Sequence, residues 1–174
     1  MRRTSRTVAA AATGALLLAG TSAATASATP AVAKAPTCRT ADLSAKLTQP
    51  LAGGMNHAGN KLVLTNTGHR TCALRGYPGL GLEGAGHRTL PTKAQWGSTW
   101  YASNPGVSTL ALAPGGQAQA VLSWTHTGSG AGDASYLEIT PPASTTHLTL
   151  PFKQQVDSGT VQVTALSTNV PLRG

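Results

Sequence analysis

The sequence has few of the residues that enzymes use for chemistry. Its 174 residues include five Asp and Glu, scattered along the chain, and only two cysteines. Glycosidases need a pair of carboxylates, and zinc sites need closely spaced Cys or His ligands. No HExxH, GxSxG or SxxK motif is present, and the five histidines have no partner at metal-ligand spacing. We therefore expect a protein that is not an enzyme, with no cofactor and no metal.

A long hydrophobic run occurs only near the N-terminus. Three arginines among the first six residues precede an apolar stretch from Val8 to Gly20, and two A-x-A patterns then end at Ala26 and Ala28. These are the three parts of a secretory signal peptide. The apolar stretch is shorter than the about 20 residues that a membrane span needs. We expect residues 1–28 to be a signal peptide, and the mature chain to be secreted, extracellular or cell-wall-associated, with no membrane contact after cleavage.

Positive charge is present but is not clustered. Without residues 1–28 the chain keeps ten Lys and Arg against five Asp and Glu, a net charge of +5. Proteins that bind nucleic acid concentrate such charge on one face and interleave it with aromatic rings. The basic residues here stand singly, so we expect a mildly basic solvated surface and no nucleic-acid partner.

Apolar residues after residue 38 alternate with polar ones, which is typical of half-buried β-strands. Short alternating segments are separated by Gly, Pro and Asn, and no segment has the period of an amphipathic helix. This pattern predicts seven to nine strands in one antiparallel β-sandwich domain over residues 38–170, preceded by a flexible leader at 29–37. The segments that carry the alternation are 43–48, 61–65, 72–74, 80–82, 110–112, 118–124, 136–140, 148–150 and 161–165.

The stretch TNTGHRTCALRGYPGL at 65–80 contains one of the two cysteines. Asn66 and Gly68 tolerate positive φ, so we expect a hairpin turn there that joins two paired strands. An even number of cysteines in an exported chain indicates a disulfide, which pairs Cys38 with Cys72. The stretch is therefore interpreted as structural, tying this hairpin to the N-terminal strand.

Four motifs resemble domain of unknown function 4232, a family of secreted or lipid-anchored actinobacterial proteins. They are CRTADL at 38–43, LTNTGHRTCALRGYPG at 64–79, LAPGGQA at 112–118 and YLEITPP at 136–142. The resemblance implies an immunoglobulin-like sandwich with a Cys38–Cys72 disulfide, and it implies no activity. Members often carry a second cysteine pair in the last third, which this chain lacks.

The segment QWGSTWYASN at 95–104 is the strongest candidate for a contact site. Trp96, Trp100 and Tyr101 stand in it among Gly, Ser and Asn residues. Aromatic faces flanked by amides hold sugars in many sandwich modules, and large exposed rings also anchor protein partners. The favoured alternative is that Trp96 and Trp100 form a lid over one open end of the core, because loops in small sandwiches usually need an apolar cover.

Three functions remain open on the sequence alone. The first is a non-enzymatic module that binds a cell-wall glycan or a secreted protein through the Trp96–Tyr101 loop. The second is an inhibitor or partner of a secreted enzyme, for which a Gly-rich loop expected at Ala52–Asn60 is the other candidate. The third is a structural domain with no ligand. Exposure of Trp96 and Trp100 distinguishes the first from the third.

Overall fold

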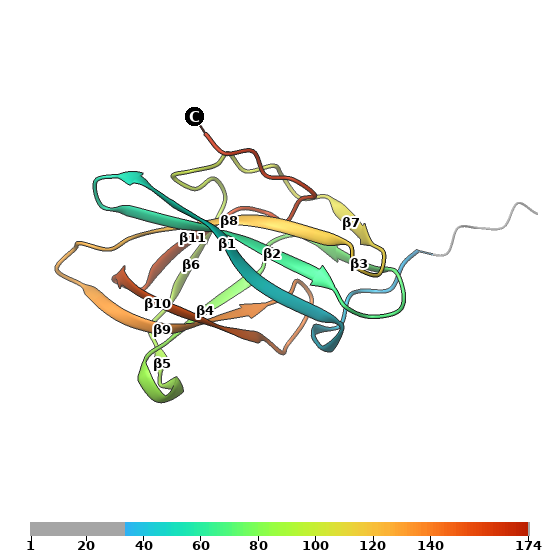
Figure 1. Ribbon diagram of the computed structural model, residues 1–174, viewed down its shortest axis with the longest axis horizontal. Helices are drawn as coiled ribbons and strands as arrows, with labels where there is room; N and C mark the ends of the chain where they lie inside the picture. Colours follow the sequence, from blue (N-terminus) through green and yellow to red (C-terminus); the bar gives the residue numbers. More distant parts are fainter. Residues whose placement is uncertain (1–33, 174) are drawn as a thin grey trace, which may run out of the picture. The chain divides into compact units, whose positions relative to one another are not determined.

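Two larger β-sheets and one short strand pair make up residues 34–173, which are the residues that the computed structural model describes (Figure 1). The larger sheet has the order β1-β2-β8-β11-β6, the second has β10-β9-β4-β5, and β3 pairs with β7. All pairings between these strands are antiparallel except that of β11 with β6. The strands are β1 Leu43–Gly54, β2 His57–Asn66, β3 Cys72–Arg75, β4 Gly79–Glu83, β5 Thr89–Leu90, β6 Lys93–Trp96, β7 Thr109–Leu112, β8 Gln117–Thr125, β9 Ala131–Thr140, β10 Leu148–Asp157 and β11 Thr160–Val163.

The all-β class expected from the alternation is confirmed, but residues 34–173 form eleven strands and not seven to nine. The two that the sequence pattern missed are β5, which has two residues, and β6, whose four residues are all exposed. β5 is too short to show alternation, and β6 has no buried face. The expected signal peptide at 1–28 lies outside the described residues, as does most of the leader. Within residues 34–173 no helix is long and apolar enough to cross a membrane.

The alternating apolar residues form one core that both larger sheets share. Leu62 of β2, Leu122 of β8 and Leu137 of β9 are each fully buried in this cluster. The ring of Trp124 meets that of Phe152 edge to face, with centroids 4.8 Å apart. Such pairs are more favourable than area alone implies, by about 0.5–1.5 kcal/mol. The contact joins β8 of one sheet to β10 of the other.

The hairpin expected around Asn66–Gly68 does not form, and this prediction is wrong. β3 pairs with β7 and not with β2. Asn66 is buried, its amide Nδ2 donates to the carbonyl oxygens of Arg70 and Leu112, and its Oδ1 accepts from the N–H of Gly68. The asparagine is therefore used for its side-chain hydrogen bonds to β7, and neither it nor Gly68 has positive φ. Those hydrogen bonds direct the chain to another strand.

The prediction of a loop at Ala52–Asn60 is also wrong, because these residues belong to the paired ends of β1 and β2, which form a hairpin. Only Met55 and Asn56 lie between the two strands, and Figure 1 shows the resulting hairpin. Glycines within a strand often mark a close approach of another group. An added Cβ at Gly59 would lie 2.7 Å from the Tyr101 ring, so this glycine makes room for that ring.

The Cys38–Cys72 disulfide is present and links the segment before β1 to the start of β3. Both cysteines are buried in the main core. Hydrogen bonds flank the bridge, since the N–H of Cys38 donates to the carbonyl of Ala73 and the N–H of Ala73 donates to that of Pro36. The ordered pairing thus begins inside the stretch that was expected to be a leader.

The disulfide closes a loop with a sequence separation of 34 residues. In the chain-entropy model a loop of this length stabilises the folded state by about 3–4 kcal/mol. We expect the double variant Cys38→Ala/Cys72→Ala to lose about that much unfolding free energy in urea titrations, and reduction of the unmodified protein to have a similar effect. Two alkylatable thiols in unreduced secreted protein would contradict the assignment.

Candidate functional site

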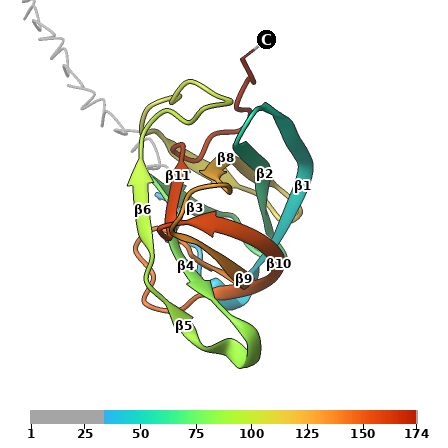
Figure 2. The same cartoon turned by 90° about the vertical axis from the view of Figure 1, so that its left-hand side faces the viewer.

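The segment between β6 and β7, residues 97–108, lies on the outer face of the five-stranded sheet, away from β9 and β10 (Figure 2). A second, smaller hydrophobic cluster holds it there together with the C-terminal residues. Leu51 of β1 and Val121 of β8 supply the sheet side of this cluster. Its members are Leu51, Ala102, Val121 and Val170, with Tyr101 and Leu172 packed against them.

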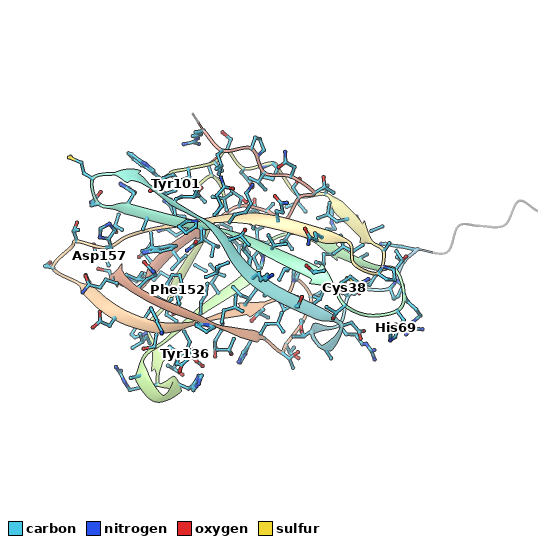
Figure 3. All side chains as sticks on the ribbon, viewed as in Figure 1. Cys38, His69, Tyr101, Tyr136, Phe152 and Asp157 are labelled. Atoms are coloured by element: carbon cyan, nitrogen blue, oxygen red, sulfur yellow. A yellow bond between two sulfur atoms is a disulfide. The ribbon has the colours of Figure 1, made fainter. Side chains whose placement is uncertain are left out.

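Tyr101 anchors the segment to the sheet. Its ring lies where a side chain at Gly59 would otherwise be, and its hydroxyl donates to the carbonyl of His57 at 2.8 Å. Burial raises the pKa of this phenol above its usual value. Figure 3 shows Tyr101 on the five-stranded sheet, on the side opposite Tyr136. Tyr101 is therefore a packing residue of the second hydrophobic cluster.

Trp100 is exposed to 52% although its ring is fixed. Its indole stacks on His57, with centroids 3.8 Å apart and planes within 14°. Its Nε1 edge lies against Gly54, where an added Cβ would come within 2.9 Å. The backbone N–H of Trp100 also donates to Ser123 Oγ at 3.2 Å. Because one indole face covers His57, the other face is the one presented to solvent.

Trp96 is exposed to 64% and has a different support. Its indole stacks on Tyr77, with centroids 5.4 Å apart and planes within 7°. The Tyr77 hydroxyl accepts a hydrogen bond of 2.7 Å from the amide of Asn104. The Oδ1 of that amide accepts from the N–H of Ala165. This ring too is held in place without being buried.

The three aromatic residues thus divide between the two expectations for this loop. Tyr101 packs on the sheet, whereas Trp96 and Trp100 present their faces to solvent. The two indoles rest on different supports, Tyr77 and His57. The sequence pattern predicts neither support, because Tyr77 and His57 come from parts of the chain that only folding brings to the loop.

This division predicts the cost of removing each ring. Trp96→Ala and Trp100→Ala should each lower the free energy of unfolding by about 1 kcal/mol, since mainly a stacking contact is lost. Tyr101→Ala should lower it by about 3 kcal/mol, because it leaves a cavity over Gly59. Urea titrations of the three variants measure the difference. A loss of 3 kcal/mol or more in both tryptophan variants would instead identify the indoles as core lids.

A second group of polar residues lies on the outer face of the four-stranded sheet. Strand pairing places Gly81 opposite Glu138, which sets the side chains of Glu83 and Glu138 diagonally across β4 and β9. An added Cβ at Gly81 would overlap the Glu138 carboxylate, so this glycine gives that carboxylate its position. His87 Nδ1 lies 2.6 Å from Glu83 Oε2, and His147 Nε2 lies 3.3 Å from Glu138 Oε1. The His87 ring also stacks on Tyr136, which Figure 3 labels.

The two carboxyls have opposite pKa shifts. The hydrogen bond from His87 is the largest cause that lowers the pKa of Glu83. Burial is the largest cause that raises the pKa of Glu138, and its hydrogen bond with Glu83 adds to the effect. Two carboxyls whose surroundings separate their pKa values can hold one proton between them. Glu83 is therefore the ionised member and Glu138 the one that takes a proton first.

The proximity of Glu83 and Glu138 is not predicted by the sequence, because the register of β4 on β9 cannot be read from alternation.

Nucleophilic hydrolysis requires a hydroxyl or thiol next to the base. Among residues 34–173 no hydrogen bond joins a Ser or Thr hydroxyl to a histidine, although several hydroxyls bond elsewhere. No group of three or more His, Cys, Asp or Glu side chains in that range is arranged to hold a metal ion.

The carboxyl pair makes stability depend on pH in a defined direction. The raised pKa of Glu138 means that its protonated form stabilises the fold at low pH, and that this stabilisation is lost as pH rises through the folded-state pKa. Glu138→Gln should therefore raise the thermal midpoint near neutral pH, with a difference that disappears in acid.

Melts of the variant at about pH 7.5 and about pH 4 bracket the ordinary range of a perturbed Glu. Asp133→Asn is the matched control, because Asp133 is an exposed carboxylate of the same strand. A midpoint for Glu138→Gln that is lower at neutral pH than that of the unmodified protein would contradict the assignment.

Comparison with known proteins agrees with the motifs in the sequence. A family model described as domain of unknown function (DUF4232) matches residues 38–167. No curated protein and no solved structure matches the chain. The matched range begins at Cys38 and includes β1 to β11, the disulfide and both polar and aromatic surfaces. Because the match covers well over half of the chain, the protein belongs to the DUF4232 family.

Proposed function

We propose that the mature chain is a secreted, non-enzymatic binding module of the cell exterior or cell wall, and that it contacts its partner through the indoles of Trp96 and Trp100. The observation that carries this proposal is that both indoles are more than half exposed and each is stacked on a second ring. Rings that are fixed before binding lose little conformational entropy when a partner is bound. Core packing does not account for them, because Tyr101 performs that task.

The distribution of exposed apolar side chains supports the same surface. The large hydrophobic residues exposed in residues 34–173 are Met55, Trp96, Trp100 and Val107. Met55 lies in the β1–β2 turn, Trp96 ends β6, and Trp100 and Val107 lie in the segment that follows β6. Exposed apolar groups that gather in a few segments mark interaction sites more often than scattered ones do.

Export and fold class belong to the same proposal. A buried disulfide between two widely separated cysteines is typical of proteins that fold in an oxidising compartment. We propose that residues 1–28 direct export, in keeping with the basic and apolar pattern there. We also propose an immunoglobulin-like sandwich, supported by the mostly antiparallel sheets and by the core that they share. The parallel pair β6–β11 is then an edge feature of that sandwich.

The double variant Trp96→Ala/Trp100→Ala tests the proposal. The unmodified protein is immobilised through its C-terminus, and we expect it to retain material from isolated actinobacterial cell wall or from culture supernatant. We expect the variant to retain at least tenfold less of that material. A cooperative thermal melt of the variant verifies that it is folded. Ser103→Ala is the control, because Ser103 is exposed in the segment between β6 and β7 but is not one of the large apolar side chains of the proposed surface. Equal retention by the variant and the unmodified protein would contradict the assigned surface.

An inhibitor of a secreted enzyme is the second candidate, and one observation favours it. The β1–β2 hairpin ends in a two-residue connection, and the side chain of Met55 there is fully exposed. A paired hairpin is stiffer than the loop expected from the sequence, as insertion into a cleft requires. Loss of retention in Met55→Ala, with the tryptophan variant unaffected, would favour this function.

A further inference from the structure

A small concavity opens on the outer face of the five-stranded sheet. It has a volume of about 60 Å³ and is lined by His57, Ser123, Trp124, Thr125, Thr160 and Gln162. These residues come from β2, β8 and β11, which are neighbours in the sheet. A water-sized group needs about 10–15 Å³ by this measure, so the concavity has room for a few hydroxyl groups but not for a protein side chain with its backbone.

The concavity is joined to Trp100 through a short chain of hydrogen bonds. The N–H of Trp100 donates to Ser123 Oγ at 3.2 Å, and the Ser123 hydroxyl donates to Gln162 Oε1 at 2.9 Å. Because Gln162 Oε1 accepts this hydrogen bond, the NH2 group of the same amide is left to act as a donor. The same wall contains His57, on which the Trp100 indole stacks. The exposed indole and the polar concavity therefore form one continuous and fixed surface.

The hydrogen-bonding groups of this surface suit a hydroxylated ligand. The Gln162 NH2 group is a donor, and a ligand hydroxyl can accept from it because a hydroxyl both donates and accepts. His57 Nδ1 and Trp124 Nε1 have no hydrogen-bond partner among the described residues, but both atoms are closed to solvent. Thr125 and Thr160 contribute further hydroxyls. None of the six lining residues is Asp, Glu, Lys or Arg, so the surface complements an uncharged ligand.

We infer that the Trp100–His57 surface is a subsite for a neutral saccharide. The C–H face of a sugar ring lies on the free face of the Trp100 indole, whose negative quadrupole attracts the slightly positive hydrogens. A hydroxyl of that ring accepts from the Gln162 amide at the concavity, where the Thr125 and Thr160 hydroxyls supply further partners. This inference rests on the proposed function and gives its ligand class.

The test uses the full mature chain and isolated actinobacterial wall material in three forms: untreated, oxidised with mild periodate, and digested with protease. Periodate cleaves vicinal diols of sugars, whereas protease removes polypeptides. We expect retention to be lost after periodate and to survive protease. Trp100→Ala should lower retention at least tenfold and Gln162→Ala at least threefold.

Gln95→Ala is the matched control for Gln162→Ala. Gln95 stands directly opposite Gln162 in the β6–β11 pair but does not line the concavity, so its removal should leave retention unchanged. Thermal melts of all three variants verify folding. If Trp100→Ala is unstable, Gln162→Ala still tests the placement of the subsite.

The remaining outcomes separate this inference from the proposed function. Retention that is lost to protease and resists periodate would overturn the saccharide assignment and leave a binding module for a protein. Retention that is lost equally in Gln95→Ala and Gln162→Ala would overturn the placement of the subsite. Absence of retention for every form of the wall material and for culture supernatant would overturn both proposals.

Discussion

The Trp100–His57 surface depends on the contact between Tyr101 and Gly59. A side chain at Gly59 would occupy the space of the Tyr101 ring, and no other residue type would let the segment after β6 lie against β2. The tyrosine hydroxyl adds a hydrogen bond to the backbone of His57, the residue on which Trp100 stacks. One partly buried ring therefore positions the exposed one. The hydrophobic cluster around Val121 secures the same segment from the C-terminal side.

The two outer faces of the protein have different chemistry. On the five-stranded sheet, uncharged hydroxyl and amide groups stand beside an exposed indole. On the four-stranded sheet, two carboxyls share an environment with two histidines, and their pKa values are shifted in opposite directions. A carboxyl pair of this kind responds to pH, because ionising both members brings like charges together. The carboxyl pair of the second face is thereby kept apart from the exposed indole of the first.

The interior of the protein is stabilised mainly by apolar packing, so these polar groups lie on the two outer faces. The main core is built from aliphatic residues, with one edge-to-face pair of Trp124 and Phe152. The disulfide links the N-terminal segment to β3, which belongs to neither of the larger sheets. It therefore secures the part of the fold with the least sheet pairing. The last third of the chain, with no cysteine, is stabilised by the long β9–β10 pair.

The sequence by itself determined the fold class, the core residues and the disulfide. Alternation of apolar and polar residues is a local property that marks each strand and its buried face, as for Leu62 and Leu137. It also identified the segment with the exposed indoles. Strand partners, however, were decided only by the tertiary structure. Asn66 directs β3 to β7 through hydrogen bonds that no local pattern reveals. Several features arise from the register between strands that are distant in the sequence: the His57 and Tyr77 supports, the Glu83–Glu138 pair and the concavity by Gln162. The stability of a register depends on the contacts of the whole sheet, so no single stretch of residues determines it.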